Sequence, residues 1–136
     1  MNNTFDGTYN AAIRVLNWKD TIISGNSFLR IQAFSDVQGK KYVALLLRGV
    51  VNPTVTGNVF EDCQYYPIRV VMRDLATVDG AVKAGYGDTV SSVSDANWST
   101  MKKNTVTNVA EKYQKIVVRE NNDQSDSDAE KKAFLQ

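Results

Sequence analysis

The stretch NNTFDGTYNAAIRV (2–15) has a second copy further along the chain, GNVFEDCQYYPIRV (57–70). Aligned without a gap, both contain an Asn, a Phe two residues later, and the triplet Ile-Arg-Val at the end. The same opening, an Asn two residues before an apolar residue, recurs in GNSF (25–28) and KNTV (103–106). Four copies of one phrase indicate a repeat protein, whose units are stable only when they stack on one another.

The segments between these phrases have the composition of short strands. They are rich in Val, Ile and Thr, and Asn, Gly, Asp and Pro separate them at turns. Helical periodicity is poor through most of the chain. The copies are unequally spaced, which argues against helical repeats of fixed length. The pattern predicts an all-β solenoid in which each coil contributes three short strands that pair with the coils above and below.

The repeated asparagines have a physical reason to recur. A tight corner between two strands favours residues that tolerate left-handed backbone angles, and Gly-Asn supplies two of them. Stacked Asn side chains can also hydrogen-bond from one coil to the next. We therefore predict a structural ladder of four asparagines: Asn3, Asn26, Asn58 and Asn104.

Alternation along the strands divides the side chains between the core and the surface. It places one group inside the solenoid, namely Phe5, Ile13, Val15 and Ile22, and another group outside, namely Arg14, Leu46 and Arg69.

Composition excludes several classes of function. The chain of 136 residues has a net charge of +1, which predicts neither nucleic acid nor a membrane as a partner. No apolar run approaches the roughly 20 residues that span a bilayer. The absence of His removes Ser-His-Asp catalysis and imidazole metal sites, and the single Cys63 cannot form an internal disulfide. We expect no cofactor and no metal.

Three segments depart from the repeat. Residues 33–42 and 75–98 are predicted loop insertions within a β-helix domain of residues 1–120. Residues 121–136 are expected to form either a disordered tail or a short capping helix. The helix is suggested by Ser127 and Glu130, which fit a capping box.

The phrases TIISGNSF (21–28) and TVTGNVF (54–60) resemble the signature of right-handed parallel β-helix proteins of the pectin-lyase-like superfamily. The resemblance covers roughly residues 1–75 and 99–120. It implies a right-handed parallel β-helix of about four to five coils with an asparagine ladder at the sharp turn. The chain would then be the C-terminal coils of a larger member.

The resemblance also carries functional expectations. Members are mostly secreted or surface-located enzymes that act on acidic or complex polysaccharides, with phage tailspikes and adhesins beside them. Their substrate groove follows the sheet that corresponds to 12–16, 44–48, 68–73 and 116–119 here. The acidic clusters of the lyases and the paired Asp of the hydrolases are missing from this sheet. Catalysis by this chain alone is therefore not expected.

Two kinds of side chain are candidates for binding a polysaccharide. Arginines on the sheet can bind uronate carboxylates in a bidentate manner, although exposed strands also carry Arg simply for solubility. Aromatic residues in the turns can stack on sugar rings, although they can equally pack over the edges of the coils. The candidates are Arg14, Arg48, Arg69, Trp18, Tyr65 and Tyr66.

Three functions remain open from the sequence. The first is a β-helix domain of a secreted or surface-located carbohydrate-active protein, without a complete active site of its own. The second is a non-catalytic polysaccharide-binding or adhesion module. The third is a structural solenoid that self-associates, for example as a homodimer, through an open β-helix end.

Overall fold

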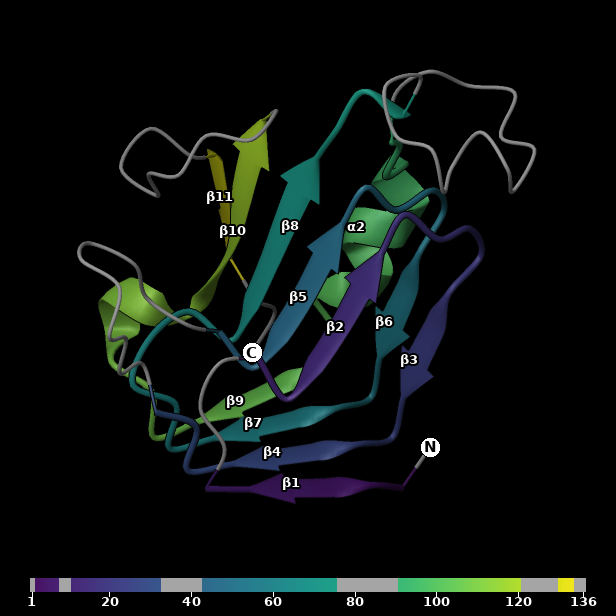
Figure 1. The fold of residues 1–136 in the computed structure, drawn as a ribbon. Helices are drawn as coiled ribbons and strands as arrows, with labels where there is room; N and C mark the ends of the chain where they lie inside the picture. Colours follow the sequence, from purple (N-terminus) through teal and green to yellow (C-terminus); the bar gives the residue numbers. More distant parts are fainter. Residues whose placement is uncertain (1, 8–10, 33–42, 76–90, 121–129, 134–136) are drawn as a thin grey trace.

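The computed structural model describes residues 2–7, 11–32, 43–75, 91–120 and 130–133. Parallel strands in three sheets make up most of it (Figure 1). The first sheet holds β1 (Thr4–Asp6), β4 (Ser27–Leu29), β7 (Val59–Glu61) and β9 (Thr105–Thr107). The second holds β2 (Ile13–Leu16), β5 (Leu45–Arg48), β8 (Ile68–Met72), β10 (Lys115–Glu120) and β11 (Glu130–Ala133). The third holds β3 (Ile22–Ser24) and β6 (Thr54–Thr56).

The chain visits these sheets in a repeating order. β1, β2 and β3 lie in the first, second and third sheet, and β4, β5 and β6 follow in the same order. Each strand pairs in parallel with its equivalent in the next repeat, so that Phe5 lies opposite Phe28 and Phe28 opposite Phe60. Only β10 and β11 are antiparallel among the described strands. The prediction of a mostly parallel, all-β structure is confirmed.

A ladder of asparagine side chains joins the four repeats just before the first sheet. Asn26 Oδ1 accepts hydrogen bonds from the backbone N–H and the Nδ2 of Asn3, at 3.2 and 3.1 Å. Asn58 Oδ1 accepts the same pair from Asn26, at 2.9 and 3.2 Å. Asn104 Oδ1 accepts the same pair from Asn58, both at 2.9 Å. Each Oδ1 thus accepts hydrogen bonds from the asparagine of the preceding repeat, and all these bonds run in one direction along the stack.

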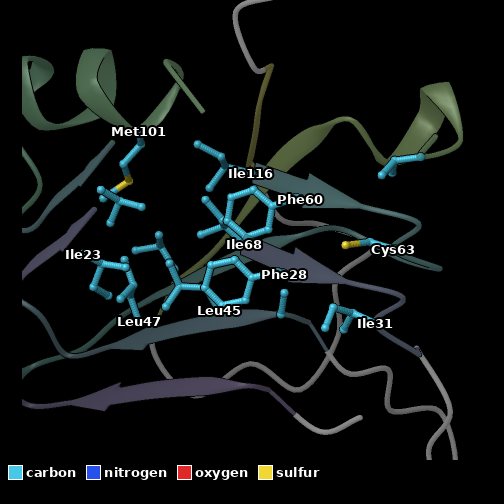
Figure 2. Packing of buried hydrophobic residues seen from close by; sticks show 14 of the residues in the cluster. Ile23, Phe28, Ile31, Leu45, Leu47, Phe60, Cys63, Ile68, Met101 and Ile116 are labelled. Atoms are coloured by element: carbon cyan, nitrogen blue, oxygen red, sulfur yellow. The ribbon is translucent and has the colours of Figure 1, made fainter. Parts of the chain in front are cut away.

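The interior between the three sheets is filled with apolar side chains (Figure 2). Phe28 lies between the rings of Phe5 and Phe60, with ring centroids 5.2 and 4.7 Å apart and nearly parallel planes. Leucines and isoleucines of the second sheet face this stack, and Ile23 and Val55 face it from the third sheet. Each repeat contributes only one short layer, so that the apolar side chains are covered mainly by the neighbouring repeats.

The corners between strands repeat as faithfully as the strands. Twelve described residues have positive φ, and all of them except Ala11 fall into columns at equivalent positions. One column, directly after the strands of the first sheet, consists of Gly7, Arg30, Asp62 and Asn108, with φ between 51° and 73°. Backbone hydrogen bonds continue through it, as from the N–H of Arg30 to the carbonyl of Glu61 at 2.9 Å. The stacking of the strands therefore extends into the turns.

The prediction that Ile22 lies inside is wrong. Its side chain is 73% exposed, whereas its neighbour Ile23 is buried and lies opposite the buried Val55. The preceding corner contains Asp20 with φ 57°, and this turn sets which alternate residue of β3 faces the core. The strand pattern predicts that neighbouring side chains point to opposite faces, but the preceding turn decides which of them faces the core.

A helix that the sequence did not predict replaces a strand in the third repeat. α2 (Asp95–Met101) begins at Ser94, whose hydroxyl accepts a hydrogen bond from the backbone N–H of Asn97. The side chain of Asn97 in turn accepts one from the backbone N–H of Ser94, which completes a capping box. The helix contacts β6, and its Met101 is fully buried in the core.

The C-terminal segment also differs from its prediction. Residues Glu130–Ala133 form strand β11 along the edge of β10, rather than part of a capping helix. A short helix is marginal in water, while the edge of β10 offers a row of unpaired backbone groups. The predicted insertion 33–42 and most of the insertion 75–98 lie outside the described residues.

We predict that Asn58→Ala destabilises the protein far more than Asn3→Ala. Asn58 is fully buried, and its amide also donates to the carbonyl of Ile23 at 3.1 Å. Its loss leaves several buried groups unsatisfied, with a cost of about 3 kcal/mol, whereas the exposed Asn3 should cost less than about 1 kcal/mol. Urea unfolding of the two variants measures both free energies. Equal costs would contradict a ladder that stabilises through burial.

A second prediction concerns Gly49, which directly follows β5 and has φ 65°. A Cβ at this position would overlap Oδ1 of Asn17 and lie 3.2 Å from Cδ2 of Leu75. Gly7 is the matched control, because it has φ 73° but its Cβ would meet nothing within 4 Å. Gly7→Ala should cost about 1 kcal/mol from backbone strain alone, and Gly49→Ala at least about 2 kcal/mol. Thermal unfolding of both variants measures the difference.

Candidate functional site

The outward face of the second sheet is the surface on which the sequence places the candidate arginines. The register sets Arg14 of β2 opposite Leu46 of β5, Leu46 opposite Arg69 of β8, and Arg69 opposite Val117 of β10. Exposure falls steadily along this row, because Arg14 is exposed, Leu46 half-buried, and both Arg69 and Val117 buried. The face is therefore open to solvent at the β2 edge and covered toward β10.

The prediction for Arg69 is correct in the direction of the side chain but wrong in expecting it to be exposed. Arg69 occupies an outward position of β8, but it is only 7% exposed. Its guanidinium carbon lies 5.9 Å from the centroid of the Tyr65 ring. This contact is a cation–π interaction, which holds the guanidinium against the aromatic ring. Arg69 is thus part of the packing over β8 and does not present its charge to a ligand.

Tyrosines cover the face near the starts of β8 and β10. Tyr65, Tyr66 and Tyr113 lie with ring centroids 4.7 to 5.1 Å apart, in tilted and edge-to-face arrangements. They form a small cluster with Val43 and Val117 that is separate from the main core. Tyr66 is buried and Tyr65 half-buried, so that their rings pack on one another. The prediction that they stack on sugar rings is not supported by this placement.

Accessible side chains at the β2 edge include Arg14, Leu16, Trp18 and Arg48, and we call these four the β2-edge surface. Arg14 and Leu16 alternate on the outward face of β2, and Leu16 lies opposite Arg48 of β5 in the register. Leu16 is 48% exposed and Arg48 half-buried. Trp18 is 61% exposed and lies just beyond the corner at Asn17, which has φ 51°. The surface combines cationic, aromatic and aliphatic groups, and the outward positions of β2, β5 and β8 carry no carboxylate.

Several described acidic residues lie in the corners instead: Asp6 and Asp62 at the first sheet, and Asp20 in the corner between β2 and β3, where its carboxylate accepts a hydrogen bond from the amide of Asn52 at 2.8 Å. Asp62 accepts a hydrogen bond from the amide of Asn108, and Asp6 forms an exposed ion pair with Arg30. These contacts join successive repeats through their turns. Within the described part of the chain, no group of three or more His, Cys, Asp or Glu side chains could hold a metal ion.

Cys63 is buried in the main core. Burial raises the pKa of its thiol to about 12, because an apolar environment disfavours the thiolate. A hydrogen bond with the backbone of Ile31 lowers this pKa somewhat, and the neighbouring Asp62 carboxylate raises it. At neutral pH the thiol is therefore protonated and a poor nucleophile.

Among the described residues, no helix is long and apolar enough to cross a membrane. Searches for related proteins found no matching family model, no similar curated protein and no similar solved structure. The resemblance to pectin-lyase-like proteins therefore rests on the repeated phrases of the sequence alone.

The candidate site differs from its prediction in its members. Arg14, Arg48 and Trp18 gather around the β2 edge, whereas Arg69, Tyr65 and Tyr66 belong to the packing over β8. Leu16 was not among the candidates, although its position two residues after Arg14 in a strand places both on one face. The missing information was exposure, which alternation alone cannot supply.

The raised pKa of Cys63 leads to a prediction about pH. The folded thiol stays protonated up to about pH 12, while the unfolded thiol ionises near 9.0. Its contribution to stability is therefore constant below pH 9 and is lost as the pH rises from 9 toward 12. The free energy of unfolding should fall more steeply over this interval in the wild type than in Cys63→Ala, as followed by urea unfolding. Rapid alkylation of the folded protein at pH 8 would contradict the burial of the thiol.

Proposed function

We propose that the chain is a right-handed parallel β-helix module of a secreted or surface-located carbohydrate-active protein, and that it binds anionic polysaccharide without transforming it. The observation that carries this proposal is the β2-edge surface, where exposed Arg14 and Leu16 of β2 lie beside β5 with its Arg48, and exposed Trp18 follows just beyond the end of β2. The fold and the binding face support one another, since the pectin-lyase-like proteins place their substrate grooves on the equivalent sheet.

Two features support the solenoid form of the fold. Consecutive strands pass from sheet to sheet in a fixed order, and equivalent strands pair in parallel in register. Parallel crossover connections are right-handed in nearly all proteins, because the twist of the strands favours that hand. The ladder from Asn3 to Asn104 and the columns of corner residues are the features expected where a coil turns at the same place in every repeat.

The chemistry of the β2-edge surface fits a polymer of uronic acids. An exposed guanidinium binds a carboxylate with two parallel hydrogen bonds, and Arg14 is free to adopt that geometry. The ring of Trp18 offers a flat apolar face for a sugar ring, and Leu16 extends the apolar area. Arginine and aromatic groups together match a polymer whose sugar units each carry a carboxylate and an apolar ring face.

The same surface lacks the paired carboxyl groups that hydrolysis requires. Glycoside hydrolysis uses two carboxyl groups on opposite sides of the scissile bond, about 5 to 10 Å apart. The described acidic residues near the turns, such as Asp6 and Asp62, make contacts between repeats at the corners of the first sheet. Recognition without turnover is therefore the activity that this part of the chain supports, and any catalytic residues would come from elsewhere in a larger protein.

Binding to polygalacturonate tests the proposal, with dextran as the neutral comparison. Calorimetry should show binding that weakens with salt, and Arg14→Ala or Trp18→Ala should each weaken it about tenfold, equal to about 1.4 kcal/mol. Arg30→Ala is the matched control, because it removes the same charge from the corner of the first sheet. Its affinity should equal that of the wild type.

Two results would contradict the proposal. One is the absence of specific binding, seen either as no binding to any uronate polymer or as an equal loss of affinity in the Arg30→Ala control. An equal loss would indicate unspecific attraction by charge. The other is the release of shortened or unsaturated oligosaccharides, which would show that the chain has an active site.

A further inference from the structure

The two ends of the stacked sheets differ in how they are closed. At the C-terminal end, β11 runs antiparallel along the outer edge of β10 in the second sheet (Figure 1). At the N-terminal end, β1, β2 and β3 each pair with only one strand among those described. An antiparallel strand cannot continue a parallel ladder of repeats. The second sheet is thus stopped on one side, and on the other side none of the three sheets has a further strand among those described.

The core is correspondingly open at the N-terminal end. The first-repeat residues Phe5, Ile13 and Val15 are half-buried, whereas their equivalents in the second repeat, Phe28, Leu45 and Leu47, are fully buried. One face of the Phe5 ring stacks on Phe28. The other side of this layer is where a further repeat would add its own apolar residue.

The asparagine ladder is also incomplete, and its two ends are complementary. Every bond in it runs from the backbone N–H and Nδ2 of one repeat to the Oδ1 of the next. Oδ1 of Asn3 accepts no hydrogen bond from a described residue, and the backbone N–H of Asn104 donates none to one. An acceptor therefore ends the ladder in the first repeat, and a donor ends it in the fourth.

The backbone of β1 shows which groups a new strand would meet. The carbonyl of Asn3 and the N–H of Gly7 bond to β4 at 2.8 and 3.0 Å. Strand alternation then directs the N–H and carbonyl of Thr4 away from β4, toward the open edge. On the opposite end of the first sheet, β9 pairs only with β7 among the described strands.

We propose that the N-terminal end of the stack is a docking surface for the C-terminal end of a second copy of this chain, and that β11 is the element that blocks it. In the docked arrangement β9 of one copy pairs in parallel with β1 of the next, and the N–H of Asn104 donates to Oδ1 of Asn3. This inference is independent of polysaccharide binding, because it uses the ends of the sheets and not the β2-edge surface.

The blocking role of β11 follows from the geometry of the second sheet. For the first sheets to join in register, β2 of the incoming copy must take the place beside β10, which β11 occupies. The intact chain is therefore expected to remain a monomer. Release of β11 frees the edge of β10, while β9 already has no further partner among the described strands. The contact is then head-to-tail, so that it generates open chains of molecules.

Proline in β11 tests the blocking role in the full chain. In Lys131→Pro/Lys132→Pro, two adjacent backbone donors are lost, and the pairing with β10 fails in either register. Lys131→Ala/Lys132→Ala removes the same charges and keeps the donors. Sedimentation velocity over a wide protein concentration range should show monomers for the wild type and the alanine control. The proline variant should show oligomers whose size grows with concentration.

A second substitution tests the N-terminal end as the surface used. Adding Thr4→Pro removes the outward N–H of β1 without removing a bond to β4, and it should return the proline variant to a monomer. Thr4→Val keeps the N–H and should leave the oligomers unchanged. Oligomers that persist in the presence of Thr4→Pro would overturn the assignment of this end.

Disulfide trapping reads the register directly. Thr4 lies opposite Ser27, Ser27 opposite Val59, and Val59 opposite Thr105, so docking places Thr105 of one copy beside Thr4 of the next. A mixture of Thr4→Cys and Thr105→Cys chains, both in the proline background, should form a disulfide between the two kinds of chain. A disulfide predominantly between two Thr4→Cys chains would indicate docking of two N-terminal ends, and would overturn the proposal.

Two further results would overturn the proposal. One is a proline variant that is folded by circular dichroism yet stays monomeric throughout the concentration range. The other is association of the wild type or the alanine control to the same extent as the proline variant, which would remove the blocking role from β11. If the double proline variant does not fold, Lys132→Pro alone serves in the same three measurements.

Discussion

Hydrogen bonds between equivalent residues of successive repeats are the constraint on which the rest of this structure depends. No repeat has enough apolar surface to form its own core, and each strand has only three to six residues. The asparagine ladder aligns the repeats at one corner, with Asn58 bonded to the repeats on both sides. Once that corner is aligned, the phenylalanines stack, the sheets pair in register, and the positive-φ corners fall into columns. The buried amides are satisfied only by one another and by the backbone, so that a shift of one residue would leave several of them unpaired.

The same stacking explains why the outward face of the second sheet is not uniform. Strand β2 is at the edge of the sheet, where Arg14 and Leu16 are covered by little else, while β8 is central and carries a cluster of tyrosines over Arg69. Equivalent positions in a repeat protein therefore have equivalent backbones but different surroundings. Arg14 and Arg69 occupy the same column, yet only Arg14 offers a charged group to a ligand. Position along the stack, and not position within the repeat, separates the binding candidates from the packing residues.

Two elements, α2 and β11, interrupt the repeating order of parallel strands. In the third repeat α2 takes the place of a strand and buries Met101, and after the fourth repeat β11 reverses direction along β10. Both lie where a further parallel strand would otherwise pair: α2 contacts β6, and β11 pairs with β10. The N-terminal end has no such element among the described residues, and this contrast makes the two ends chemically different.

The sequence by itself determined the positions that repeat. The spacing of Asn and Phe, together with β-branched segments and Gly-Asn corners, was enough to predict the ladder positions and the parallel strands, because these depend on local residue types that recur. Only the tertiary structure decided the rest. The phase of β3, which buries Ile23 and exposes Ile22, depends on the turn at Asp20. The burial of Arg69 and Tyr66 depends on side chains from other repeats, and β11 depends on an edge that exists only after β10 has paired. Each of these is a contact between segments distant in sequence, and periodicity within a segment carries no information about what covers it.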